Sequence, residues 1–330
     1  MIQQEPVWSF SPRKTLTQWY GHVHLLDNHV LGQWFCLDRS SGTCFWENSF
    51  RRANTISGIT DNVIVASETT NYFATIDAGC YGIDLASGNL LWTSHANGLL
   101  GILLRICDFV PGYLNSMRDS PLLVNGDQTT TSRGRILDVS TGKQIDRISR
   151  KKALELFMQN FYSPEKELYH KGFVRYHNSW IAHQLPNAGQ SISELEWTKD
   201  FYNNGFHIYR LDANEKIEWE FHLKDHIEGT YYSYHFDTRY VYMIVSQEKN
   251  YHTNSHNGRT EYRPVKYFFF TLDLEQGKIV QDFPLSDSSF VTCRIEDVDT
   301  HGILISFRKN FVQSKYNNEN EILRYYKKQL

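Results

Sequence analysis

The stretch that decides the fold is Phe35-Cys-Leu-Asp38-Arg-Ser-Ser-Gly42-Thr-Cys-Phe-Trp46, in which two apolar runs flank an aspartate and a glycine. An aspartate at the start of a turn accepts hydrogen bonds from backbone N–H groups two or three residues further along. A glycine four residues later takes a positive φ without the clash that a Cβ would cause. The stretch therefore predicts two antiparallel strands joined by a tight turn.

The same pattern returns along the chain. Four further copies occupy residues 81–92, 135–145, 208–219 and 270–280, with turn aspartates at Asp84, Asp138, Asp212 and Asp273. The copy at Asp212 has no glycine and is one residue shorter. Successive aspartates lie 46 to 74 residues apart, a spacing that fits one four-stranded sheet plus variable loops.

Two further strand-like runs precede each hairpin, for example Thr55–Thr60 with Val63–Ser67, and Tyr231–Phe236 with Tyr240–Val245. The last unit stops after its third run, Ile322–Lys327, whereas the amino terminus offers Val7-Trp8-Ser-Phe10, which is similar to a fourth strand. We expect these two ends to pair and to close a ring. The run 151–160 is the exception, because its apolar spacing predicts a short connecting helix.

The Asp-x-x-[Ser/Thr]-Gly-x-x-x-Trp hairpins resemble the repeats of the quinoprotein-like (PQQ-like, tryptophan-docking) β-propeller superfamily. The resemblance implies an all-β propeller of about six four-stranded blades, with seven as the alternative, in which tryptophans dock between neighbouring blades and the two chain ends share the last blade. It implies one domain over residues 1–330, with approximate blades at 15–47, 50–94, 96–149, 152–221, 222–283 and 285–330 plus 6–10.

The superfamily includes quinone-dependent dehydrogenases and non-catalytic scaffolds, so the fold transfers and the activity does not. This chain departs from the dehydrogenases because it is shorter, has no export signal and has no vicinal cysteine pair. A redox enzyme is disfavoured on these grounds, and no cofactor is expected.

Composition excludes several classes of partner. The formal net charge is -3, so no overall positive field favours nucleic acid or an anionic membrane. No run of about 18 apolar residues occurs, and the amino terminus has neither a basic flank nor an apolar stretch. These features predict a cytoplasmic protein, and the five cysteines, which lack a CxxC spacing, are expected to stay reduced.

No catalytic or metal site is predicted. His22 and His24 alternate within a strand-like run, and His252, His256 and Glu261 share a polar loop, but solvated or core-edge histidines are the favoured interpretation of both groups. Serine elbows, glycine-rich phosphate loops and HExxH helices do not occur. No acid, base or nucleophile is nominated.

Three long insertions carry the functional hypothesis. Residues 184–204, 247–266 and 309–321 each fall between the second and third strands of a predicted blade, so three consecutive blades build up one sector of one face. Aromatic and charged residues of the kind found at protein interfaces occur in them. The candidate partner-binding residues are Trp197, Phe201, Tyr202, Tyr251, His252, Arg259, Tyr262, Phe311 and Tyr316.

The sequence therefore predicts a non-catalytic propeller that recognises another protein. One alternative is a small-ligand-binding or hydrolytic propeller that uses a central channel lined by inner strands such as Thr55–Thr60 and Tyr231–Phe236. The other alternative is a bacterial immunity protein, similar in role to an antitoxin, that neutralises a secreted effector.

Overall fold

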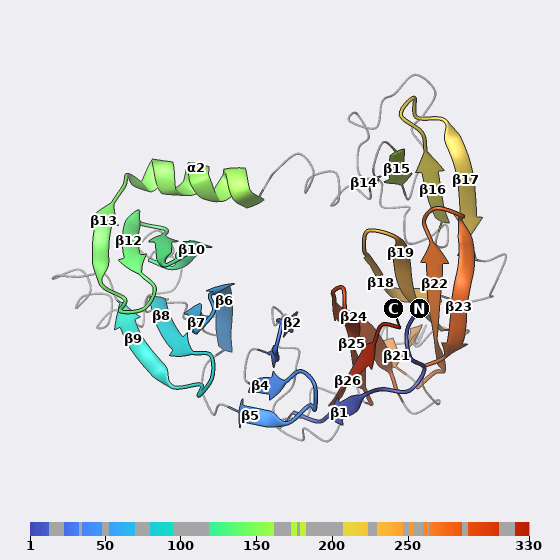
Figure 1. Cartoon of the computed structure of the whole chain (residues 1–330), viewed down its shortest axis with the longest axis horizontal. Coiled ribbons are helices and arrows are strands. Elements are labelled where there is room, and N and C mark those ends of the chain that lie inside the picture. Colours follow the sequence, from blue (N-terminus) through green and yellow to red (C-terminus); the bar gives the residue numbers. More distant parts are fainter. Residues whose placement is uncertain are drawn as a thin grey trace. The chain divides into compact units, whose positions relative to one another are not determined.

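The computed structural model describes residues 1–12, 23–32, 35–47, 53–69, 80–94, 119–161, 173–176, 179–182, 207–223, 230–246, 251–253, 260–262, 264–285, 290–309 and 321–329. Within these residues the chain forms six four-stranded antiparallel sheets, one two-stranded sheet and one helix (Figure 1). The prediction of an all-β chain built from four-stranded sheets is confirmed. The chain divides into two compact units, Lys14–Phe161 and Met1–Arg13 with Tyr162–Leu330.

The unit Lys14–Phe161 holds three sheets, numbered here in chain order. Sheet one consists of β2 (His24–Leu25), β3 (His29–Leu31), β4 (Phe35–Asp38) and β5 (Cys44–Glu47). Sheet two consists of β6 (Ala53–Ile59), β7 (Val63–Thr69), β8 (Cys80–Asp84) and β9 (Leu90–Ser94). Sheet three consists of β10 (Pro121–Asn125), β11 (Gln128–Thr131), β12 (Arg135–Asp138) and β13 (Gln144–Arg147), and helix α2 (Arg150–Phe161) follows it.

The other unit holds sheets four to six. Sheet four consists of β14 (Phe173–Tyr176), β15 (Ser179–Ala182), β16 (His207–Leu211) and β17 (Ile217–His222). Sheet five consists of β18 (Thr230–Phe236), β19 (Tyr240–Ser246), β22 (Tyr267–Asp273) and β23 (Lys278–Pro284). Sheet six consists of β24 (Thr292–Val298), β25 (Gly302–Arg308), β26 (Glu321–Lys327) and β1 (Trp8–Phe10).

The two ends of the chain meet in sheet six. Strand β1 pairs antiparallel with β26, which places Trp8 opposite Tyr325, and their rings stack with centroids 5.6 Å apart. The side chain of Gln281 in sheet five fixes the residues ahead of β1, because it accepts from the N–H of Ile2 at 2.8 Å and donates to the carbonyl oxygen of Ile2 at 2.6 Å. The predicted pairing of the termini is confirmed.

The turn aspartates act as the sequence predicts. Asp38 Oδ1 accepts from the backbone N–H of Ser41 at 2.7 Å and from the hydroxyl of Ser40 at 2.6 Å. Gly42 has a φ of 71°, the left-handed conformation that glycine adopts without strain. In the shorter turn that begins at Asp212, Glu215 takes a φ of 62° instead.

Tryptophans join neighbouring sheets within each unit. The indole N–H of Trp46 in sheet one donates to the carbonyl oxygen of Leu85 in sheet two at 2.8 Å. Trp92 in sheet two makes the equivalent bond to Val139 in sheet three at 2.6 Å. A Cβ on Gly142 would lie 2.4 Å from the Trp92 ring, so the turn glycine also makes room for the indole.

The junction between sheets four and five uses the same packing with a different donor. Trp219 lies against Gly277, where a Cβ would come within 2.6 Å of the ring. Among the described residues no acceptor meets its indole N–H. Arg210 instead donates to the carbonyl oxygen of Leu274, which occupies the place of Leu85 and Val139, at 3.0 Å.

Helix α2 confirms the predicted connecting helix and extends one residue beyond it at each end. The hydroxyl of Ser149 accepts from the N–H of Lys152 at 3.2 Å and caps the first turn. Ala153 is 1% exposed, and the helix packs against β10. In the described part of the chain no helix has the length and apolar character needed to cross a bilayer.

The described cysteines are thiols, as predicted. No disulfide joins Cys36 and Cys44, although both lie in the hairpin of sheet one. Burial, reinforced by the nearby Cys44, raises the pKa of Cys36 to about 12. The Cys36 thiol is therefore protonated at neutral pH and is a poor nucleophile. Cys107 lies outside the described residues.

The turn aspartates predict a loss of stability in acid. Hydrogen bonds hold the pKa of each carboxyl below its usual value of 3.8, led by the hydroxyls of Ser40, Ser87 and Ser140 for Asp38, Asp84 and Asp138, and by the N–H of Lys216 for Asp212. A lowered pKa in the folded state stabilises the protein above the pKa of the unfolded state, and this stabilisation is lost as the pH falls through the folded pKa.

We therefore expect the urea midpoint to stay constant from neutral pH to about 5 and to fall below about pH 4. An Asp138→Asn protein keeps one acceptor oxygen and loses one titrating group, so its midpoint should fall less between pH 5 and 3. A wild-type midpoint that does not change across this range would contradict the expectation.

Candidate interaction surface

The three long insertions lie where the sequence places them. Each follows the second strand of its sheet and precedes the third: between β15 and β16, between β19 and β22, and between β25 and β26. In an antiparallel sheet these connections leave from the end opposite the turns that join the first to the second and the third to the fourth strands. Within sheet five, the insertion and the Asp273 turn are therefore at opposite ends.

The insertion of sheet five contains a ribbon rather than the loop that the sequence suggested. Strands β20 (Tyr251–Thr253) and β21 (Thr260–Tyr262) pair antiparallel. Their register sets Tyr251 opposite Tyr262 and His252 opposite Glu261. The candidate residues Tyr251, His252 and Tyr262 thus belong to one short two-stranded sheet.

The other candidates are not placed by the structure. Those outside the described residues are Trp197, Phe201, Tyr202, Arg259, Phe311 and Tyr316. Their convergence on one surface remains a prediction from strand order. The sequence did contain a signal for the ribbon that our interpretation overlooked, because Asn257-Gly258, a favoured hairpin pair, lies between the two strands in the chain.

The base of the sheet-five insertion is anchored to sheet six. Val265 is 4% exposed, and its N–H donates to the carbonyl oxygen of Phe290 at 3.0 Å. The hydroxyl of Tyr267, at the start of β22, donates to the carbonyl oxygen of Val291 at 2.5 Å. The chain therefore re-enters the sheet at a fixed position.

The base of the sheet-six insertion is closed by an ion pair. Arg308 ends β25, Glu321 begins β26, and their guanidinium and carboxylate are in contact. Glu321 is 4% exposed, and the carbonyl oxygen of Arg308 accepts from the N–H of Val291 at 2.6 Å. Both insertions thus start and end on strand termini that are buried or half-buried and are held by hydrogen bonds or an ion pair.

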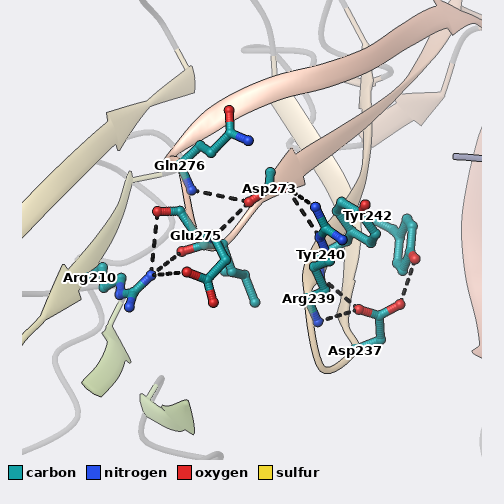
Figure 2. A network of polar contacts seen from close by, with 9 residues as sticks. Arg210, Asp237, Arg239, Tyr240, Tyr242, Asp273, Glu275 and Gln276 are labelled. Carbon is teal, nitrogen blue, oxygen red and sulfur yellow. Dashed lines mark hydrogen bonds and ion pairs between the residues drawn. The ribbon is translucent and has the colours of Figure 1, made fainter. Parts of the chain in front are cut away.

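The opposite end of sheet five carries a polar network (Figure 2). Arg210 from sheet four donates to the carbonyl oxygen of Leu274, and its guanidinium lies 3.6 Å from Glu275 Oε2. Asp273, which is 1% exposed, accepts from the N–H groups of Glu275 at 2.8 Å and Gln276 at 3.1 Å. The contacts of Arg210 join strand β16 of sheet four to the Asp273 turn of sheet five, and the bonds to Asp273 fix that turn internally, which are structural roles.

Asp237 continues this network toward sheet six. Its Oδ1 accepts from the N–H groups of Arg239 at 2.8 Å and Tyr240 at 2.7 Å, and its Oδ2 accepts from Tyr242 at 2.6 Å and Lys328 at 2.7 Å. Burial alone would raise the pKa of Asp237, but the bonds from Lys328 and Tyr242 outweigh it, and the pKa is lowered. The carboxylate is thus ionised at neutral pH and ties the residue that follows β26 to sheet five.

Two polar residues of β18, the first strand of sheet five, are relevant to the alternative hypothesis that a ligand binds in a central channel. The hydroxyl of Ser233 in β18 accepts from the N–H of Ile295 in β24 at 3.1 Å, so it contributes to the contact between sheets five and six. His235 lies two residues further along, and burial lowers its pKa despite the opposing effects of Asp297 and Asp237. The imidazole is therefore neutral at neutral pH.

Metal ligands are not grouped in the described part of the chain, where no three His, Cys, Asp or Glu side chains are arranged to hold an ion. His24 lies in β2, whereas His22 and His256 fall outside the described residues. Comparison with protein-family models and with curated proteins gives no match to this sequence.

Proposed function

We propose that the chain is a quinoprotein-like β-propeller of six blades, and that it binds another protein through the insertions of sheets four to six. The observation that carries the proposal is the repeated position of these insertions. Three consecutive sheets of one unit each carry extra chain at the same connection, between the second and third strands. A rigid set of sheets with variable loops at one end is a common way to build a recognition surface.

Repeated tryptophan packing supports the propeller. The same ring-on-glycine contact joins sheets one and two, two and three, and four and five. A closed ring uses every sheet in the same way and shares the last one between the two chain ends. The pairing of β1 with β26 fits that requirement.

The fixed attachment of the insertions to their sheets supports a role in binding a partner. The chain that follows the ribbon of β20 and β21 returns to sheet five through the buried Val265, so a partner would meet the ribbon next to a fixed support. A fixed support lowers the entropy that binding costs. We expect the partner to be a protein. The net charge of -3 gives no positive electrostatic field that would attract a nucleic acid.

The test deletes the ribbon of β20 and β21 and keeps the buried residue at the base of the insertion, Val265. Residues 248–263 are replaced by a short glycine-containing turn, and Val265 is retained because its side chain is buried. We expect a partner captured from the native host by the full chain to be recovered about tenfold less with the variant, at an unchanged melting temperature. Isotope-labelled quantification of the captured protein gives the ratio.

The matched control alters the opposite end of sheet five. Glu275→Ala with Gln276→Ala changes two exposed turn residues and should leave capture unchanged. Equal recovery with the ribbon variant and the full chain would show that this insertion does not bind the partner. A loss of the same size with the control would point to the other end of the sheet.

A further inference from the structure

Helix α2 exposes two large apolar side chains on one side. Leu154 is 40% exposed and Met158 is 49% exposed. Residues four apart lie above one another on a helix, so the two side chains form a continuous stripe. Ala153, by contrast, is 1% exposed. The helix contacts strand β10, which is drawn beside it in Figure 1.

Basic residues begin the helix, and two of them, Arg150 and Lys151, lie one turn before Leu154 beside the stripe. Arg150, Lys151 and Lys152 are all exposed in the first turn of α2, which contains no acidic residue. Cations at the start of a helix interact unfavourably with the helix dipole. Lys151 lies 3.9 Å from Glu155 one turn later, but both side chains are exposed, so this pair contributes little to the stability of the helix. Residues 143–161 contain five basic and two acidic side chains, although the whole chain has a formal net charge of -3.

We propose that the α2 surface, defined by Arg150, Lys151, Leu154 and Met158, binds an acidic amphipathic segment of another protein. The apolar side chains of that segment would cover Leu154 and Met158, and its carboxylates would lie beside Arg150 and Lys151. Charge complementarity of this kind steers association and selects the partner. The surface belongs to the unit Lys14–Phe161, whereas the insertions of sheets four to six belong to the other unit.

A protein segment fits this surface better than a lipid bilayer does. A helix that lies in a membrane interface buries its whole apolar face among the lipids. In α2 the side chain of Ala153 is buried against the protein, and those of Leu156 and Phe157 are half-buried. Among the described apolar side chains of the helix, only Leu154 and Met158 are therefore exposed enough to insert into a bilayer. Twelve residues span about 18 Å, a length that suits a helical segment of similar size.

The first test is charge reversal in the full chain. The probe is a fluorescent peptide of about 20 residues with leucines at helical spacing and glutamates elsewhere, and a scrambled peptide of the same composition is its control. We expect anisotropy to report binding that weakens at high salt, and Arg150→Glu with Lys151→Glu to weaken it about tenfold or more. Because acidic residues stabilise a helix start, this variant should melt at or above the wild-type temperature.

The second test removes the apolar stripe. Leu154→Ser with Met158→Ser should also weaken binding about tenfold, whereas Ile217→Ser, at a 48% exposed position of β17, should not change it. Three results would overturn the proposal: no binding of the peptide, binding that both variants retain, or equal binding of the scrambled peptide. Association with vesicles that contain anionic lipid, in the absence of peptide binding, would identify a membrane surface instead and would also overturn it.

Discussion

Replacing Trp92 by alanine is expected to lower the free energy of unfolding by about 3–5 kcal/mol. The indole is 8% exposed and packs on Gly142, and its N–H donates to the carbonyl oxygen of Val139 at 2.6 Å. Removing it leaves a cavity between sheets two and three and an acceptor without its partner. Urea unfolding of the purified chain measures the change.

Leu91 supplies the matched control for Trp92. It is the preceding residue of β9 and is 47% exposed, so Leu91→Ala removes an apolar side chain that the neighbouring sheet does not cover. We expect a change of about 0.5 kcal/mol or less. If both substitutions cost the same, Trp92 does not hold the two sheets together.

Replacing Asp119 by alanine is expected to cost about 3–5 kcal/mol, because it leaves a buried cation unpaired. The side chains of Asp119 and Arg135 are 2% and 7% exposed and form an ion pair. Arg135 also donates to the hydroxyl of Ser94 at 2.9 Å, so the pair joins the last strand of sheet two to sheet three. Urea unfolding again gives the change.

Two control variants test whether the loss of stability comes from leaving a buried charge unpaired and not simply from removing a charged side chain. Asp119→Leu combined with Arg135→Met replaces both charges by apolar groups and should recover most of the lost stability. Glu155→Ala breaks the exposed pair with Lys151 and should cost about 0.5 kcal/mol or less. A single Asp119 variant as stable as the wild type would show that Arg135 finds another partner.

The hairpins could be predicted because their signals are local. An aspartate and a glycine four residues apart determine the turn from within one segment, and the turns at Asp38, Asp84 and Asp138 form as expected. The pairing of β1 with β26 was also predictable, since an incomplete last sheet needs a fourth strand. The helix at Arg150–Phe161 followed from apolar spacing.

Contacts between sheets could not be predicted in detail, because they depend on residues far apart in the chain. Nothing in the local sequence shows that Arg210 donates to the carbonyl oxygen of Leu274, or that Gln281 binds the backbone of Ile2. The pair of Asp119 and Arg135 escaped notice for the same reason, since a charge is read from sequence as solvated until its burial is known.

The sequence predicted where in the chain the candidate interaction surface lies, but not how its side chains are arranged. Strand counting located the three insertions, and the structure agrees with that count. The ribbon was missed because three-residue strands carry little periodicity, although Tyr251 and Tyr262 are residues that favour strands. The exposed apolar stripe of α2 was also missed, because a 3.6-residue pattern alone does not say which positions the sheet covers.

Sheet six also sets an order of assembly during synthesis. The strand that contains Trp8 leaves the ribosome long before its neighbour, which contains Tyr325, is translated. Until that moment the early strand and the edge of β25 have no hydrogen-bonding partner in this sheet, and both are open to pairing with other chains. Joining residues so far apart is slow because loop closure comes first, so this sheet is the part of the fold most exposed to aggregation while the chain folds.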